Sequence, residues 1–356
     1  MLNGKCGKAT ILGFNNRKVL VTGHTGFKGS WLCHILKGAG ADVYGYALDP
    51  PTDPSLFEVA DVGKRMYSEI GDIRDYDRLY SFISDVRPEI IIHLAAQPLV
   101  LYGYEHPRET YETNVMGTVN VLECVRNTDS VKSFLNVTTD KVYKNDEKGG
   151  QFAETDPLDG YDPYSNSKSC SELVTHSYKN SFFDKECAIS TARAGNVIGG
   201  GDFSNDRIVP DCVRAAISGT SIHMRNPDSV RPYQHVLEPL IAYLTIVSEQ
   251  EKDPSLSGYY NVGPLEEDNV TTGELVELFR DSWGDMKPPT YGSGHRHEAG
   301  YLRLNIDSIR EKFGFEPRWD IATAVDRTVE WSKIWSSGGD VVECMDNQIR
   351  EYLGSD

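Results

Sequence analysis

Three adjacent polar residues, Thr139, Asp140 and Lys141, follow the apolar run VKSFLNV at residues 131–137. A hydroxyl, a carboxylate and an amine at the end of a predicted strand can move protons to and from a bound substrate. The alternative is a solvated turn, for which polar residues are equally suitable. Because the residue types suit both, the hypothesis of an acid/base cluster needs a second signal.

That second signal is a Tyr-x-x-x-Lys pattern at Tyr164 and Lys168, within the segment PYSNSKSCSEL. The segment is typical of a helix start, and a spacing of four residues places both side chains on one helix face. An ammonium group beside a phenol stabilises the phenolate and lowers its pKa toward neutrality. We therefore predict that Tyr164 takes a proton from a substrate hydroxyl to which Thr139 is hydrogen-bonded.

A glycine-rich turn precedes these residues, at GHTGFKG. It follows a short strand pattern and opens a helix pattern, which is the context of a dinucleotide-binding loop. Gly23 permits a tight turn, Gly26 lets backbone N–H groups reach a diphosphate, and Gly29 allows close packing of helix and strand. All seven residues are predicted cofactor contacts: Gly23, His24, Thr25, Gly26, Phe27, Lys28 and Gly29. Lys28 could bind a 2′-phosphate, but a backbone-adjacent or solvent-facing position is favoured.

The predicted cofactor is NAD, because Asp49 lies 20 residues beyond Gly29, at the end of the next strand pattern. A carboxylate there accepts hydrogen bonds from a ribose 2′-hydroxyl and repels the 2′-phosphate of NADP. Its alternative role is a turn before Pro50. Further predicted cofactor contacts lie in GDIRD, HLAAQ and the helix pattern that begins at Asn114, where packing of helix on sheet is the alternative: Asp72, Ile73, Ala95, Ala96, Gln97 and Asn114, with Tyr164 and Lys168.

The elements that must position these residues alternate between strand and helix patterns from residue 18 onward. Continuous apolar strands such as EIIIHLA fit a parallel sheet that is covered on both faces. The predicted fold is α/β, a Rossmann-like doubly wound parallel sheet with a smaller mixed α/β substrate-binding lobe. We assign residues 16–193 and about 230–255 to the cofactor domain and about 194–229 and 256–356 to the lobe, with 1–15 as a loosely ordered extension.

Bulk composition narrows the class of protein. The 356 residues carry a formal net charge of -17, which argues against nucleic acid or an anionic membrane as partner. Neither a signal peptide nor a membrane span is evident in the sequence, so a cytoplasmic location is expected. The seven cysteines form no C-x-x-C pair, and we expect reduced thiols and no metal site.

The collected motifs resemble the extended short-chain dehydrogenase/reductase superfamily, and within it the sugar-nucleotide 4,6-dehydratases. The similarity extends from about residue 18 to about 335 and rests on these stretches: VTGHTGFKGSWL, PSLFE, SEIGDIRD, HLAAQPLV, ETYETNVMGTVNVLE, TTDKVY, GYDPYSNSKSCSELV, RAGNVIGGGD, DRIVPD, RNPDSVRPYQHVLEPL and HEAGYLRL. It is closest to the branch of the family that acts on CDP-linked glucose, which carries Lys where other branches carry Glu at position 141.

The resemblance implies oxidation at C4 of the sugar, loss of water across C5 and C6, and reduction at C6, with NAD tightly bound and regenerated in each turnover. It implies Asp140 as the acid toward the C6 oxygen and Lys141 as the base at C5, although the two roles could be exchanged. It further implies a nucleotide-sugar substrate, a homo-oligomer (dimer or tetramer) built on the helices that begin near Asn114 and Tyr164, and a step in deoxysugar synthesis for a surface polysaccharide such as an O-antigen.

Six residues of the lobe are candidate substrate contacts, and a surface ion pair is the alternative for each arginine: Asn196, Arg207, Arg225, Arg231, Asn261 and Tyr301. Arginine can bind a diphosphate through two parallel hydrogen bonds. Two positions depart from the pattern of the CDP-glucose branch, with Leu101 in place of Arg and Tyr233 in place of Trp. The alternatives are therefore dehydration of another nucleotide-hexose, 4-epimerisation, or a non-catalytic binding protein, and Asp140 with Lys141 argue against the last two.

Overall fold

The computed structural model describes residues 11, 13–183, 187–292 and 300–354. Its described residues contain a parallel sheet of seven strands in the order β11-β6-β5-β4-β1-β2-β3. The strands are β1 (Lys18–Thr22), β2 (Asp42–Ala47), β3 (Tyr67–Ile70), β4 (Ile90–His93), β5 (Ser133–Thr139), β6 (Ala188–Ala194) and β11 (Tyr259–Val262). The predicted doubly wound α/β fold is confirmed.

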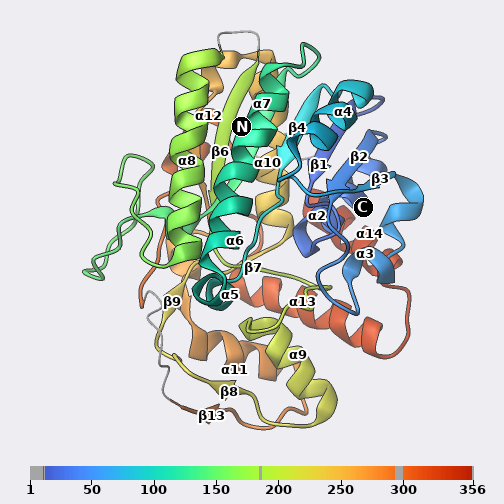
Figure 1. The fold of residues 1–356 in the computed structure, drawn as a ribbon. Helices are drawn as coiled ribbons and strands as arrows, with labels where there is room; N and C mark the ends of the chain where they lie inside the picture. Colours follow the sequence, from blue (N-terminus) through green and yellow to red (C-terminus); the bar gives the residue numbers. More distant parts are fainter. Residues whose placement is uncertain (1–10, 12, 184–186, 293–299, 355–356) are drawn as a thin grey trace.

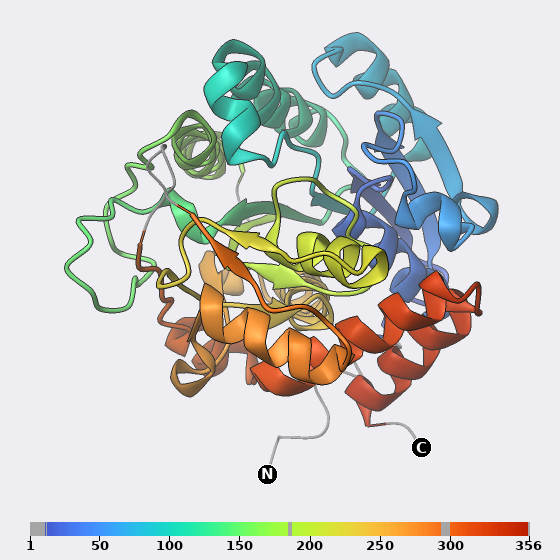
Figure 2. The same cartoon turned by 90° about the horizontal axis from the view of Figure 1, so that it is seen from below.

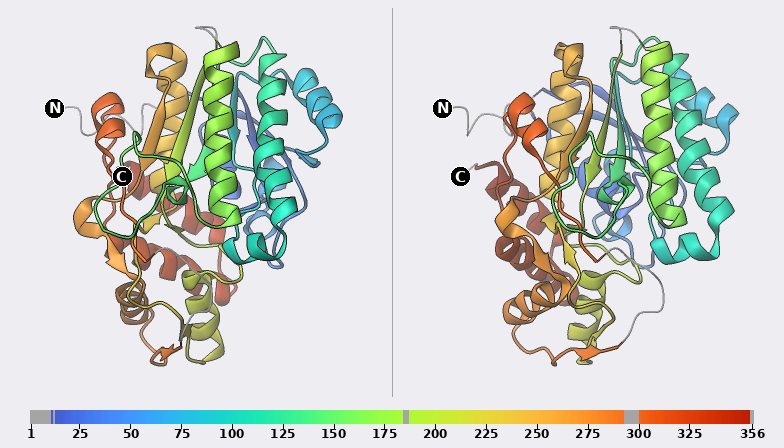
Figure 3. Two further views of the ribbon diagram at one scale, coloured as in Figure 1. Left: turned by 60° about the vertical axis from the view of Figure 1, so that its left-hand side comes forward. Right: turned by 90° about the vertical axis from the view of Figure 1, so that its left-hand side faces the viewer.

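Helices cover both faces of this sheet (Figure 1 and Figure 3). One face carries α4 (Tyr76–Val86), η2 (Glu112–Met116), α7 (Gly117–Arg126) and α8 (Pro163–Phe182). The other carries α2 (Phe27–Gly38), α10 (Leu237–Lys252), α12 (Asp307–Phe313) and α14 (Val341–Leu353), with the short α3 (Leu56–Val59) beside α2. Strands β4, β5 and β6 are buried along their whole length, and burial on both faces explains the apolar run IIIH of β4.

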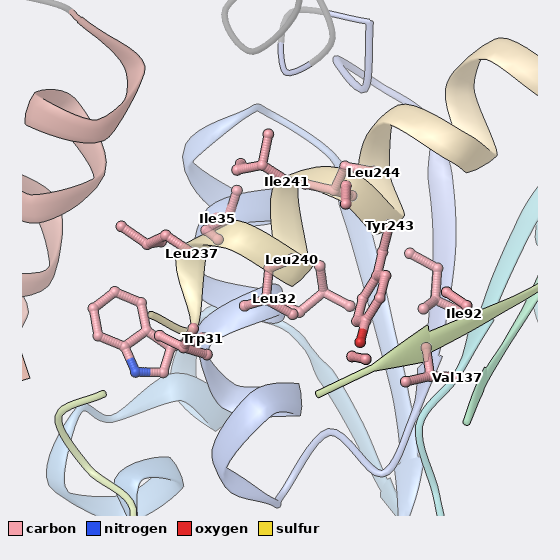
Figure 4. Close-up of a cluster of buried hydrophobic side chains, with 14 of the residues drawn as sticks. Trp31, Leu32, Ile35, Ile92, Val137, Leu237, Leu240, Ile241, Tyr243 and Leu244 are labelled. Atoms are coloured by element: carbon pink, nitrogen blue, oxygen red, sulfur yellow. The ribbon is translucent and has the colours of Figure 1, made fainter. Parts of the chain in front are cut away.

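The main hydrophobic core lies between the sheet and the layer of α2 and α10. Figure 4 shows Trp31, Leu32 and Ile35 of α2 facing Leu240 and Tyr243 of α10. Helix α10 is buried over nearly its full length, and none of its side chains from Leu237 to Ser248 is exposed. This burial fixes α10 along the face of the sheet, with its end at Gln250 bonded to the starts of β5 and β6, and it fixes the position of Tyr243 as well.

The smaller lobe lies beyond the end of the sheet where β5 and β6 finish, at the bottom of Figure 1 and facing the viewer in Figure 2. Its helices are α9 (Ile208–Ser218), α11 (Thr272–Trp283) and α13 (Ile321–Ser336), which share a second hydrophobic core. Its short strands are β7 (Val197–Ile198), β8 (His223–Met224), β9 (Val230–Arg231), β10 (Gln234–His235), β12 (Val270–Thr271) and β13 (Thr290–Tyr291).

The domain boundaries stay a prediction, with two differences in the structure. Strand β11 pairs with β6 in the central sheet, although we had placed its residues in the lobe. Of the expected extension 1–15, residues 1–10 and 12 lie outside the described residues, while Phe14 is buried in the main core. No helix in the described residues is long and apolar enough to cross a membrane.

Candidate active site

The glycine turn between β1 and α2 has the geometry that its sequence predicts. Gly23 has a φ of +75°, a conformation that side chains other than glycine rarely adopt. A Cβ atom on Gly29 would lie 2.1 Å from the carbonyl oxygen of Gly23, so only glycine fits. The Gly23 backbone also lies against Ala95 at the end of β4, since a Cβ there would be 2.7 Å from the Ala95 nitrogen. The turn thus leaves room for a flat ligand over the first turn of α2.

The side chains of His24 and Thr25 link this turn to the neighbouring strands. The buried His24 Nε2 is 2.7 Å from the Ser68 hydroxyl, and burial lowers its pKa to about 4. The Thr25 hydroxyl donates to the Leu48 carbonyl oxygen, which ties the turn to the end of β2. Both residues would therefore contact a ligand through their backbone atoms. Asp49, two residues beyond β2, is exposed, and its contact with a ribose stays a prediction.

Gln97 and Asn114, two predicted cofactor contacts, are engaged with one another. The Asn114 amide oxygen accepts from the Gln97 backbone nitrogen at 2.8 Å, and its amide nitrogen donates to the Gln97 carbonyl and the Ser167 hydroxyl. The Gln97 side chain is bonded to Thr110 and to the backbone of Leu99. The Asn114 side chain thus anchors the loop after β4 to α8, and its contact with the cofactor stays a prediction.

The remaining predicted cofactor residues line the ends of the strands. Asp72, beyond β3, forms a two-pronged ion pair with Arg74, which holds its carboxylate at the surface. Ile73 is buried, and its side chain fills the space that Gly117 leaves at the start of α7. Ala96, like Ala95, is small and half-buried just beyond β4.

Thr139, Asp140 and Lys141 lie at the carboxyl end of β5, in the turn η3 (Asp140–Val142). The Thr139 hydroxyl donates to Asp140 Oδ1 at 2.9 Å. Asp140 is 1% exposed, and its other oxygen, Oδ2, has no hydrogen-bond partner among the described residues. The Lys141 Nζ is likewise buried without such a partner. Buried polar atoms without partners are rare in proteins, and here they indicate a place for a ligand.

Tyr164 and Lys168 extend from α8 into the same region. The Tyr164 phenol is hydrogen-bonded with Thr139, and the Lys168 Nζ donates to the Val137 carbonyl at 3.2 Å. Burial raises the pKa of Tyr164 to about 12, against the opposing effects of the Thr139 hydrogen bond and the charge of Arg207. The prediction that Lys168 lowers this pKa toward neutrality is wrong for the protein alone, because burial disfavours phenolate more than its neighbours favour it.

Lys28 is partly buried, and its side chain turns into the site, so the favoured solvent-facing position is wrong. Burial, together with repulsion by Lys168 and Arg207, lowers its pKa to about 7, while Asp140 opposes this shift. Burial also lowers the pKa of Lys168 to about 8, against the charge of Glu172. Arg207, which precedes α9, completes a group of three cationic side chains, and its charge also acts on Tyr164.

Arg231 and Tyr301 lie together where the lobe meets the sheet. Arg231 is 2% exposed, and its guanidinium donates to the Val230 carbonyl. Val230 in turn forms a bridge with Tyr301, whose ring has the Arg303 guanidinium 5.0 Å from its centroid. Asn196 lies between β6 and β7, half-buried, and its backbone oxygen accepts from Gln234. These positions remain candidates for binding of the nucleotide.

Asn261 and Arg225 do not reach the site as expected. Asn261 is fully buried, and its amide accepts from the Tyr143 hydroxyl and donates to the carbonyl oxygens of Phe152 and Asn305. It therefore joins β11 to two loops instead of contacting substrate. Arg225 is 48% exposed and pairs with Asp206 at 3.6 Å, which is the surface ion pair that its sequence also allowed.

The two departures from the family pattern occupy different surroundings. Leu101 lies on α5 (Val100–Glu105), which precedes α6 (Pro107–Tyr111) and packs against the start of α8 near Tyr164. Tyr233 is 3% exposed in the core of the lobe, with its hydroxyl 3.0 Å from that of Thr272. Leu101 therefore lies on the helix whose Gly103 contacts Tyr164, whereas Tyr233 lies in the core of the lobe.

Sequence reasoning missed Glu172, Arg193 and Tyr243. Glu172 follows Lys168 by one helical turn, so its spacing was a signal that could have been used. It forms a buried ion pair with Arg193 of β6 at 2.9 Å. The Tyr243 hydroxyl is fully buried and has no partner in the described part of the chain. No sequence signal singles out Tyr243 within the apolar helix α10.

Solved structures share this architecture. A UDP-glucose 4-epimerase from Stenotrophomonas maltophila, with bound NAD and formylated UDP-arabinopyranose, has a TM-score of 0.81 at 20% identity and covers 91% of this chain and 100% of its own. A dTDP-glucose 4,6-dehydratase from Bacillus anthracis, in complex with NAD, has a TM-score of 0.77 at 24% identity and covers 92% of this chain and 99% of its own. Both structures therefore share the fold of this chain, a parallel sheet with helices on both faces.

Sequence comparison narrows the class further. The family model for GDP-mannose 4,6 dehydratase matches residues 20–328. The chain is 44% identical to CDP-glucose 4,6-dehydratase of Salmonella typhimurium over 350 residues, which are 96% of this chain and 98% of the relative. It is 27% identical to dTDP-glucose 4,6-dehydratase of Streptomyces antibioticus, over 88% of this chain and 91% of the relative. The chain belongs to the GDP-mannose 4,6 dehydratase family, and the resemblance of its motifs to sugar-nucleotide 4,6-dehydratases is confirmed.

Proposed function

We propose that this protein is an NAD-dependent CDP-glucose 4,6-dehydratase, which converts CDP-D-glucose to CDP-4-dehydro-6-deoxy-D-glucose and water. The observation that carries the proposal is the meeting of Tyr164 with Thr139 beside the unpartnered Oδ2 of Asp140 and Nζ of Lys141. The relative at 44% identity over nearly the whole chain supports CDP-glucose as substrate. The relatives act on nucleotide sugars, and we propose a role in deoxysugar synthesis.

The glycine turn fits the proposed cofactor. The left-handed Gly23 makes the tight turn, and a Cβ on Gly26 would meet only the Gly23 carbonyl oxygen, at 3.5 Å, so the backbone at the α2 N-terminus is open to a diphosphate. The exposed carboxylate of Asp49 suits the 2′-hydroxyl of NAD. The glycine turn and Asp49 would hold NAD, which would supply the hydride acceptor for oxidation at C4 and the hydride donor for reduction at C6.

The side chains of this protein move the protons. Tyr164 accepts the proton of the C4 hydroxyl, which Thr139 orients, and the positive charge of Lys168 stabilises the phenolate as it forms. Once C4 is a carbonyl, its neighbour C5 is acidic, and Lys141 removes the C5 proton. Asp140 gives a proton to the C6 oxygen, which leaves as water, and a proton returns to C5 when C6 is reduced. The raised pKa of Tyr164 means that substrate and cofactor must complete its activation.

The test is incubation of the purified protein with NAD and a panel of CDP-, UDP-, GDP- and dTDP-hexoses, followed by mass spectrometry. Loss of one water from CDP-glucose alone is the expected result. Loss of water from a different nucleotide-hexose would keep the reaction and reject CDP, with Leu101 as the first residue to vary. Inversion at C4 without loss of mass would make the protein an epimerase.

Two variants test the roles of the residues. Tyr164→Phe removes only the hydroxyl, so we expect NAD binding without turnover. Lys141→Ala should permit oxidation at C4 but not loss of water. Because Lys141 is the proposed base at C5, this variant should also fail to exchange the C5 hydrogen with deuterated solvent. Wild-type turnover by Tyr164→Phe would reject the proton-transfer scheme.

A further inference from the structure

Tyr243 presents an unexplained polar atom inside the main core. The residue is fully buried, and Figure 4 shows its ring beside Ile92 and Val137, under the strands that end at the site. Its hydroxyl has no hydrogen-bond partner among the residues that the structure describes. A buried hydroxyl without a partner costs roughly 1–3 kcal/mol, a cost that a phenylalanine would avoid. The hydroxyl therefore calls for a partner that a ligand could supply.

Lys28 lies over the ring that carries this hydroxyl. Its ammonium is 6.0 Å from the centroid of the Tyr243 ring. It belongs to the first turn of α2, directly after the glycine turn, where backbone N–H groups favour an anion. Tyr243 is in turn electrostatically coupled to Tyr164, so the pair reaches the reacting groups from the α10 side of the sheet.

The charges around Lys28 are unbalanced. Lys168 from α8 and Arg207 from the lobe both repel it, although Arg207 is paired with Asp202 at 3.5 Å and Glu172 acts on Lys168, and Asp140 is the acid that acts on Lys28 in the opposite direction. The whole chain carries a net charge of -17, so a cluster of cations is not a consequence of its composition. Cationic groups drawn together from three separate elements create a local positive potential that suits an anion.

We propose that Lys28 and Tyr243, together called the Lys28–Tyr243 corner, bind a diphosphate, the ammonium by ion pairing and the hydroxyl by donating a hydrogen bond. The inference rests on the proposed function, because both the dinucleotide and the nucleotide sugar carry a diphosphate. It explains why a lysine is turned toward two other cations and why a tyrosine is buried without a partner. The Lys28 side chain and Tyr243 of α10 thus add to the backbone N–H groups of the glycine turn that are predicted to bind the diphosphate.

The corner makes binding dependent on pH. The groups that face Lys28 are Lys168 and Tyr164 on α8, Arg207 before α9, Asp140 after β5 and Tyr243 on α10. With a pKa of about 7, Lys28 is mostly neutral at pH 8 in the unliganded protein. A bound diphosphate favours the charged form, so binding at pH 8 takes up a proton and weakens as the pH rises above about 7. Lys168, with a pKa of about 8, contributes to the same uptake.

The experiment is isothermal titration at pH 8 in two buffers of different ionisation enthalpy, with NAD alone and with CDP alone. The proteins are the wild type, Lys28→Met, Tyr243→Phe and Lys37→Met, a control at the far end of the same helix. We expect Lys28→Met to lose most of one proton of uptake and at least tenfold in affinity. Tyr243→Phe should keep the uptake and lose about tenfold, while Lys37→Met should match the wild type. The nucleotide's own titration is common to all four proteins and cancels.

The two ligands distinguish the sources of the diphosphate. If Lys28→Met loses proton uptake on binding NAD, the corner binds the cofactor. If it loses proton uptake on binding CDP, the corner binds the substrate. Unchanged uptake and affinity with both ligands would overturn the proposal. Thermal unfolding without ligand serves as the folding control, and here Lys28→Met should be as stable as the wild type or more so, since repulsion from Lys168 and Arg207 is relieved. Should Lys28→Met fail to fold, Tyr243→Phe decides by affinity alone.

This outcome is separable from that of the proposed function. A protein that shows Lys28-dependent proton uptake but converts no nucleotide-hexose would reject the dehydratase and retain the corner. A protein that dehydrates CDP-glucose while Lys28→Met binds both ligands normally would retain the dehydratase and reject the corner.

Discussion

The buried ion pair between Glu172 and Arg193 offers the sharpest test of how the catalytic helix is held. The two side chains are 1% and 3% exposed, and Arg193 Nη2 is 2.9 Å from Glu172 Oε2. Glu172 also accepts from the hydroxyls of Thr138 and Thr191, and Arg193 Nη1 donates to the Tyr143 hydroxyl. The pair thus joins α8, which carries Tyr164 and Lys168, to β5 and β6.

We expect Glu172→Gln to lower the free energy of unfolding by about 3–5 kcal/mol, because it leaves the Arg193 charge buried without its counter-ion. Replacement of both partners by Met should recover much of that loss, since no buried charge remains. Urea denaturation of Glu172→Met, Arg193→Met and the double variant measures the coupling. The control is Glu249→Gln, which breaks an exposed pair with Lys252 and should cost less than about 1 kcal/mol.

The same substitution should move the pH dependence of turnover. Burial lowers the pKa of Lys168 to about 8, and Glu172 is the group that opposes this shift. Without the carboxylate the pKa falls further, so the charged form of Lys168 is lost at a lower pH. The basic limb of the pH profile of kcat should therefore shift toward lower pH in Glu172→Gln. An unfolding free energy within about 1 kcal/mol of wild type, together with an unmoved basic limb, would refute this reasoning.

Three further predictions concern other parts of the molecule. Gly29→Ala places a Cβ 2.1 Å from the Gly23 oxygen, so we expect a loss of about 1–3 kcal/mol in urea denaturation and of NAD affinity by titration, whereas Gly38→Ala, with no atom within 4 Å of its Cβ, should lose neither. Burial raises the pKa of Glu238 to about 7, which is above its unfolded value, so stability should fall by up to about 3 kcal/mol as the pH rises from 4.5 to 7. Glu238→Gln should remove that dependence in denaturation at several pH values. Met116 and Leu173, 52% and 55% exposed on η2 and α8, should lie in a homo-oligomer interface, so Glu at both positions should yield a monomer in light scattering, while Ile217→Glu on the lobe should not.

Local patterns predicted most of the α/β framework. The runs at residues 18–22, 90–93 and 133–139 are strands. The helical patterns at residues 30–40 and 114–127 correspond to α2 and α7. These patterns carry the information because burial on both faces demands continuous apolar strands and a glycine turn demands glycine. Strand β11 was not assigned to the sheet, since YYNV lacks the continuous apolar run that marks the equally short β4.

The candidate site was predictable where spacing along one element is enough. Tyr164 and Lys168 share a helix face, and Thr139 and Asp140 are adjacent in sequence, so each pair could be found without a structure. Asn261 was misassigned, because an asparagine that satisfies a buried backbone looks the same in sequence as one that awaits a ligand. Only the hydrogen bonds of the folded chain distinguish the two.

The sequence by itself determined the fold class, the glycine turn and the principal acid/base residues, because each is fixed by contacts between near neighbours in the chain. The tertiary structure alone decided the environment of those groups. Burial raises the pKa of Tyr164 where a lysine one turn away predicted the opposite. Lys28, Lys168, Arg207 and Tyr243 come from four distant segments. Their juxtaposition depends on how the α2, α10 and lobe layers pack, and long-range packing sets both the desolvation and the charges that act on each group.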